Sequence, residues 1–83
     1  MSETTRKAVV YWISEPPVRC DISGLLIGKS FVDGHLPGQT TWGCFDPEIF
    51  ARMGGTLGLG LGQRYVKQPE GQEDAGRWLK VEG

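Results

Sequence analysis

The chain has 83 residues, of which 13 are glycine, and a formal net charge of −1. A chain of this length forms one domain with a modest core, and each glycine raises the entropic cost of folding. The charge gives no overall attraction to a phosphate backbone, so nucleic-acid binding would require a local basic patch. No apolar run approaches the ~20 residues that span a bilayer, and "MSETTRK" lacks the apolar core of a signal peptide. We therefore expect a soluble protein made in the cytoplasm.

The first predicted element is a strand at 7–14, "KAVVYWIS", because β-branched and aromatic residues are frequent there and "EPP" ends it. The pattern leaves open which side of this strand faces the core. Between Gly24 and Cys44, the short apolar pieces "LLI", "SFV" and "TTW" alternate with the turn signals "DG" and "PG". We expect short strands joined by tight turns in this region, and no helix.

One short helix is predicted within "FDPEIFARMGG", where Asp46 precedes the first helical residue. The Asp46 side chain can accept hydrogen bonds from free backbone amides, and Pro47 fits the first helical position. An acidic residue, Glu48, suits the positive end of the helix dipole. The pattern also predicts an inward-facing apolar stripe, made by Ile49, Phe50 and Met53. Gly54 is expected to end the helix in a left-handed conformation.

The C-terminal third predicts a β-hairpin with strands "RYVKQ" (64–68) and "RWLKV" (77–81), joined by the polar "PEGQEDAG". Pairing in register places Val66 and Leu79 on one face, and strand alternation places Val81 on that face as well. The opposite face is aromatic and basic, with Tyr65, Lys67, Trp78 and Lys80. An ordinary solvated hairpin and a binding platform fit this pattern about equally well. As a platform for bases or a protein partner, it would have Arg64 or Arg77 beside it.

Glycine and leucine alternate between helix and hairpin in "GGTLGLGLGQR" (54–64), which resembles fragments of phosphate-binding loops. A dinucleotide fingerprint needs a strand before its glycines and a helix after them, and here that order is reversed. A P-loop would also end in Gly-Lys-Ser/Thr. We interpret the segment as a structural or interface element, whose glycines let the backbone turn or approach another chain closely. Its glycines are Gly58, Gly60 and Gly62, and its apolar anchors are Leu57, Leu59 and Leu61.

Residues suited to catalysis are sparse. The one histidine, His35, precedes "LPG" in a predicted turn, which favours a surface position over a general base. Ser23 and Ser30 have no recognisable activating context, and the carboxylates are scattered over turns and caps. We expect a protein without enzymatic activity and without a cofactor.

The two cysteines form one linked pattern. Cys20 begins "CDIS" and Cys44 begins "CFDP", 24 positions later. A zinc ribbon or treble clef places its Cys-x-x-Cys knuckles in similar positions, before a β-hairpin and at the start of a short helix.

Together with other short motifs, these units resemble those of a family of small phage and prophage proteins with a zinc-ribbon-like, or treble-clef-like, domain. The resemblance covers residues 18–83 of the single expected domain at 1–83, after an N-terminal strand and proline-rich breaker at 1–17. It implies a small β-rich α+β fold with one short helix and a C-terminal hairpin. The matching pieces are Cys20, "FVDG" (31–34), "TWGC" (41–44), "GLGLGQRYVKQ" (58–68) and "GRWLKVEG" (76–83).

The chain departs from this family where the second ligand of each knuckle belongs, since Ser23 and Pro47 stand there. Structural zinc takes four thiolate or imidazole ligands, whereas proline has no side-chain donor and a neutral hydroxyl is a poor one. We therefore expect no metal. Rescue by His35 with Asp21 or Asp46 is a minor alternative, because such irregular spacing is uncommon in metal sites.

The resemblance also implies a different use for the remaining thiols. Two sulfurs on one zinc lie about 3.8 Å apart, so loss of the metal would allow a Cys20–Cys44 disulfide with little backbone movement. Closing a loop of about 25 residues would stabilise the fold by roughly 3.5 kcal/mol. In reducing cytosol the pair would instead remain as buried thiols.

From these features we expect a non-enzymatic binding or structural module of phage type, in the virion or in the host cytoplasm. The leading hypothesis is a virion-associated protein that decorates or stabilises the capsid. One alternative is nucleic-acid binding through the hairpin face, with strongly salt-dependent affinity. Another is inhibition of a host enzyme or defence complex. All three involve a macromolecular partner, and oligomerisation is compatible with each.

Overall fold

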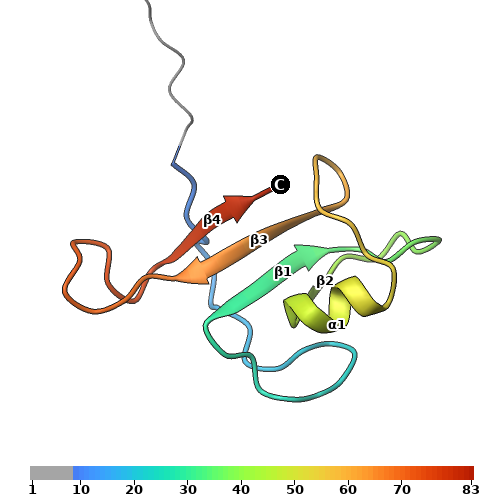
Figure 1. The fold of residues 1–83 in the computed structure, drawn as a ribbon, viewed down its shortest axis with the longest axis horizontal. Helices are drawn as coiled ribbons and strands as arrows, with labels where there is room; N and C mark the ends of the chain where they lie inside the picture. The colour runs from blue at the N-terminus through green and yellow to red at the C-terminus, as the bar shows by residue number, and fades with distance from the viewer. Residues whose placement is uncertain (1–8) are drawn as a thin grey trace, which may run out of the picture.

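The computed structural model describes residues 9–83, which form one antiparallel sheet and one short helix (Figure 1). The strands lie in the order β2-β1-β3-β4, and the helix follows β2 in the chain. The small β-rich α+β class predicted from the sequence is confirmed. The elements are β1 (Ser30–Gly34), β2 (Gly43–Phe45), α1 (Pro47–Arg52), β3 (Gly62–Lys67) and β4 (Trp78–Glu82).

The predicted helix is confirmed, with Asp46 as its N-cap and Pro47 in its first turn. The Asp46 carboxylate accepts hydrogen bonds from the amides of Glu48, at 2.9 Å, and Ile49, at 3.2 Å. Only part of the predicted apolar stripe is inward, however, because Phe50 is buried whereas Met53 is 53% exposed. α1 ends at Arg52, so Met53 lies beyond its last turn and beside open solvent.

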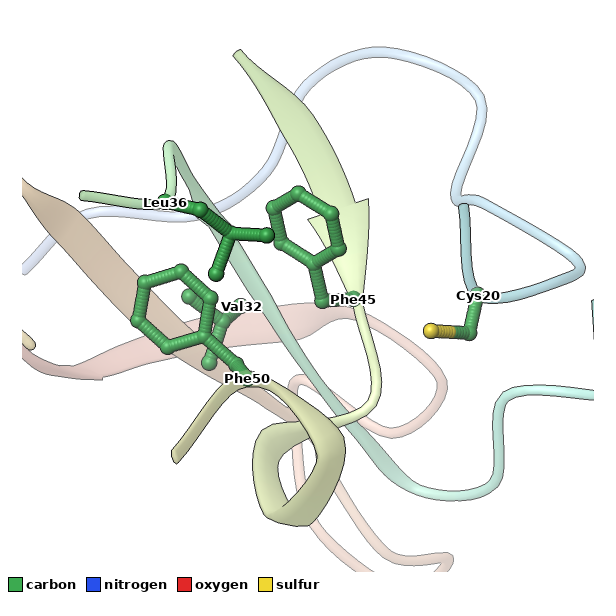
Figure 2. Packing of buried hydrophobic residues seen from close by; sticks show 5 residues of the cluster. All are labelled: Cys20, Val32, Leu36, Phe45 and Phe50. Carbon is green, nitrogen blue, oxygen red and sulfur yellow. The ribbon is translucent and has the colours of Figure 1, made fainter. Parts of the chain in front are cut away.

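One face of the sheet packs against α1 and forms the helix-side cluster, whose five buried residues are shown in Figure 2: Cys20, Val32, Leu36, Phe45 and Phe50. The rings of Phe45 and Phe50 stack with centroids 5.4 Å apart. Phe50 lies over the β1–β3 pair Gly34 and Gly62, where an added Cβ would lie 3.3 Å and 3.2 Å from its ring. These glycines therefore give the helix its close approach to the sheet.

The opposite face carries the aromatic cluster, defined by Trp12, Phe31, Tyr65 and Trp78. Phe31 is fully buried at its centre, 5.1 Å from the ring centroids of Trp12 and Trp78 and 5.3 Å from that of Tyr65. Successive residues of a strand point to opposite faces, so Phe31 and Val32 supply the centres of two different clusters. The small sheet thus has a core on each side.

The predicted strand at 7–14 is wrong for its described residues, because residues 9–14 form no continuous strand. Tyr11 makes an isolated antiparallel bridge to Leu79 on the outer edge of β4. Backbone hydrogen bonds on either side join Trp12 to Trp78 and Lys80 to Val10. The pairing extends to Trp12, whose ring packs over Phe31 and Tyr65. Residues 7 and 8 of the prediction lie outside the described residues.

The predicted short strands in the middle of the chain are confirmed for "SFV" by β1, and β2 begins just after "TTW". The "LLI" piece forms no strand, and only Leu26 makes a bridge, to Arg19. The C-terminal hairpin is confirmed in the predicted register, since Val66 pairs with Leu79. Within residues 9–83, the structure contains no helix with the length and apolar character to cross a bilayer.

Candidate interaction surface

The aromatic residues of the predicted hairpin platform are not available on the surface. Tyr65 is 7% exposed and Trp78 is 9% exposed, because both belong to the aromatic cluster. The sequence correctly placed them on one face, but that face is covered by Trp12, whose ring lies 5.3 Å from that of Tyr65 in an edge-to-face arrangement. Both rings are therefore buried in the aromatic cluster, and their binding of a partner stays a prediction.

The basic residues of the predicted platform are dispersed among separate interactions. Arg64 pairs with Glu82, with 2.6 Å between nitrogen and oxygen. The Arg77 guanidinium lies 3.8 Å from the centroid of the Tyr11 ring. Lys67 is exposed and Lys80 is half-buried. The structure thus does not gather these four side chains and the two rings into one accessible surface.

The predicted Cys20–Cys44 disulfide is absent, and both residues carry free thiols. Cys20 is buried in the helix-side cluster, whereas Cys44 packs against the aromatic cluster. Adjacent segments bring their backbones together, because the Asp21 amide donates to the Cys44 carbonyl at 2.9 Å. The side chains nevertheless diverge into different cores. Thiol titration of the native, unreduced protein is expected to count two free cysteines.

The two thiols have opposite electrostatic surroundings. Burial raises the pKa of Cys20, but hydrogen bonds from the amides of Ser23, Asp46 and Ile22 and from the Ser23 hydroxyl outweigh it and lower the pKa overall. Burial, followed by the charges of Asp33 and Asp21, raises the pKa of Cys44 to about 11. Cys44 is consequently a protonated, unreactive thiol at neutral pH.

Among residues 9–83, no group of three or more histidine, cysteine, aspartate or glutamate side chains could hold a metal ion. The alternative set of His35 with Asp21 or Asp46 is not brought together. Asp21 accepts a hydrogen bond from the Cys44 amide at 2.8 Å, and Asp46 caps α1. His35 instead faces two carbonyl oxygens, with Nε2 2.9 Å from Gly60 and Nδ1 3.1 Å from Leu36.

The glycine-leucine segment forms a tight turn before β3 that presents one leucine to solvent. Gly58 and Gly62 join their backbones across the turn at 2.8 Å and 3.0 Å, and Gly60 has a φ of +76° that favours glycine. The side chain of Leu59 lies at the tip, and the residue is 94% exposed. Leu61 is 41% exposed, whereas Leu57 packs against the helix-side cluster.

An open apolar groove lies on the helix side of the sheet, with a volume of about 420 Å³. We call it the Trp42 groove. Buried Leu36 and Phe45 contribute to its lining, together with three exposed apolar residues and a polar group. The exposed residues are Ile22, Trp42 and Met53, and the polar group is Asp21, Gln39 and Thr41.

His35 connects the groove with the glycine-leucine turn. Its ring centroid lies 5.6 Å from that of Trp42, its Nε2 faces Gly60, and its amide donates to the Leu61 carbonyl at 3.1 Å. The β1–β2 loop, which carries His35 and Trp42, and the glycine-leucine turn lie at the same end of the sheet, where β1 ends and β2 and β3 begin (Figure 1). We call the combined region the Trp42–Leu59 surface; its exposed apolar residues are Ile22, Trp42, Met53, Leu59 and Leu61.

Sequence reasoning identified only the leucines of this surface. Trp42 lies in the polar stretch "GQTTWG", and neither helical nor strand periodicity marks it as exposed. A large aromatic residue in a loop rich in glycine and threonine was the available signal.

Comparison of the chain with protein-family models, with curated proteins and with solved structures found no match.

Proposed function

We propose that the protein is a non-enzymatic binding module that docks onto a capsid protein or another virion protein through the Trp42–Leu59 surface. The observation that carries this proposal is the 94% exposure of Leu59 on a turn whose backbone is held by hydrogen bonds within itself and to His35. A leucine held in this way gains from burial by a partner without a large loss of loop entropy.

The composition of the surface favours a protein partner. Tryptophan and methionine are enriched at protein interfaces, and a tryptophan beside a groove is a typical anchor. The polar groups at the groove, including Asp21 and Thr41, would supply the directional hydrogen bonds that fix the orientation of the partner.

The virion assignment rests on the resemblance to phage zinc-ribbon-like proteins. One feature of the described residues supports that ancestry, because the amides of Ile22 and Ser23 and the Ser23 hydroxyl lower the pKa of the Cys20 thiol. Ser23, which stands in the sequence position of the second ligand of a knuckle, therefore lies close to Cys20. A metal-free descendant of a zinc ribbon is the fold assignment that we propose.

The two alternatives gain less support. Nucleic-acid binding on the hairpin face has lost its stacking rings, since Tyr65 and Trp78 are buried. Inhibition of a host enzyme would use the same Trp42–Leu59 surface and differs from the virion role only in its partner. Location of the protein in the phage life cycle therefore separates this alternative from the proposal.

Quantitative mass spectrometry of purified particles of the encoding phage tests the proposal. We expect the chain in a fixed ratio to the major capsid protein, unchanged by further purification of the particles. Its absence from particles, together with its abundance in the soluble fraction of infected cells, would contradict the virion role and favour the host-directed alternative.

A further inference from the structure

A second concave site lies at the other end of the sheet, between the start of β1 and the β3–β4 connection. It is an open groove of about 820 Å³, a size typical of small-molecule sites. We call it the Lys29–Lys67 groove after its two cations; its lining also includes Gly28, Gln68, Glu70 and Gly76. None of these residues lines the Trp42 groove.

The two lysines lie on neighbouring chain segments. Ser30 pairs with Val66 in the β1–β3 ladder, and the Lys67 amide donates to the Lys29 carbonyl at 2.8 Å. This hydrogen bond brings the two residues side by side, with Lys29 at a bend just before β1. Like charges on neighbouring segments repel each other.

No carboxylate within residues 9–83 forms an ion pair with either lysine. The ion pairs in this part of the chain join Arg52 with Glu48 and Arg64 with Glu82. Glu70 also lines the groove, but it lies on the β3–β4 connection and makes no such pair. The groove thus holds two lysines without an ion pair against one carboxylate, and a bound anion would offset the remaining positive charge.

We propose that the Lys29–Lys67 groove binds the phosphoryl group of a small ligand. A phosphate monoester carries a charge of about −1.5 to −2 at pH 7 and offers three strong acceptor oxygens, which matches two ammonium groups better than a single carboxylate does. Gly28 and Gly76 keep the adjoining wall free of side chains, and an added Cβ at either would meet no atom within 4 Å. The volume beyond the lysines would hold the organic part of the ligand.

Amide NMR of the full chain, titrated with inorganic phosphate and with adenosine monophosphate, tests this proposal. We expect saturable shifts centred on Gly28 and Gly76, stronger at pH 7.5 than at pH 5 because phosphate then carries its second charge. Equal affinities would identify free phosphate as the ligand type, whereas tighter binding of the nucleotide would identify an ester whose organic part contacts the groove.

Substitutions separate a binding role from a structural one. Lys29→Gln and Lys67→Gln are each expected to weaken binding about tenfold, as for loss of one charge-assisted hydrogen bond. Both variants should melt at or slightly above the temperature of the parent protein, because each removes one of two neighbouring like charges. Lys80→Gln, on β4 and outside the groove, is the matched control and should bind normally. Absence of saturable shifts, or equal weakening by Lys80→Gln, would overturn the proposal.

Discussion

The two faces of the sheet differ in what lies beside their buried residues. On one face, Trp12 closes over Phe31 and Tyr65, and the rings lie in mutual contact at 5.1–5.3 Å. On the other face, α1 has only six residues, and Leu36 and Phe45, although only 9% and 6% exposed, also line the open Trp42 groove. The four rings of the aromatic cluster line neither groove, so aromatic content alone does not identify a binding surface in a domain of this size.

The largest expected effect on stability comes from removing a ring of the aromatic cluster. Phe31→Ala removes the fully buried ring at the centre of the aromatic cluster and should lower the free energy of unfolding by about 3–5 kcal/mol. Urea denaturation followed by tryptophan fluorescence measures this loss. Leu61→Ala, at a partly exposed position outside that cluster, is the comparison. Equal losses for the two variants would show that the two regions do not differ as described.

A second effect concerns Cys44, which packs against the aromatic cluster beside Asp33. Its pKa is about 11 in the folded protein against an ordinary value of 9.0. The unfolded chain therefore releases this proton first as pH rises, so the contribution of Cys44 to stability should be lost between pH 9 and pH 11. Cys44→Val should remove that part of the pH dependence, as measured by urea denaturation across the range. An unchanged slope would contradict the burial of this thiol.

A smaller effect on stability is expected at the start of α1, the helix on the side of the sheet that carries the Trp42 groove. Asp46→Ala removes the acceptor for two helix amides and should destabilise the protein by about 1 kcal/mol. Glu48→Ala removes the exposed ion pair with Arg52 and a negative charge in the first helical turn, and should change stability by less than Asp46→Ala does. Thermal unfolding of both variants provides the measurement, and a larger loss for Glu48→Ala would contradict this account of the cap.

The smallest effect on stability is expected at the Trp42–Leu59 surface. Leu59→Asp replaces a residue that is 94% exposed and should change the free energy of unfolding by less than about 0.5 kcal/mol. Ile13→Asp is the matched control, since Ile13 is 93% exposed on the segment that precedes the sheet. A large destabilisation by Leu59→Asp alone would indicate that this leucine supports the fold.

Local signals in the sequence predicted much of the fold. The Asp46-Pro47 pair predicted the start of α1, and strand alternation predicted the Val66–Leu79 register, because caps and hairpins depend on neighbouring residues. Burial of Tyr65 and Trp78 was not predictable in this way. It depends on Trp12, more than 50 positions earlier, which folds over the hairpin. Long-range cover of this kind leaves no periodic signal in either segment.

The cysteines show the same limit. Their matching spacing predicted that the two segments meet, and the hydrogen bond between Asp21 and Cys44 brings them together. Whether the sulfurs face each other depends on the side-chain direction of Cys44 in β2, which the paired strand β1 determines. The Trp42 groove was missed for a related reason, because three separate segments form it.

Retention of variants in assembled particles tests the central claim most directly. Under the proposed virion role, phage that encode the parent chain, Leu59→Asp or Ile13→Asp would be purified, and the amount of the chain per capsid protein would be measured by mass spectrometry. We predict that Leu59→Asp is lost from particles while remaining folded and expressed, and that Ile13→Asp is retained at the parent level. Retention of Leu59→Asp at the parent level would contradict docking through the Trp42–Leu59 surface.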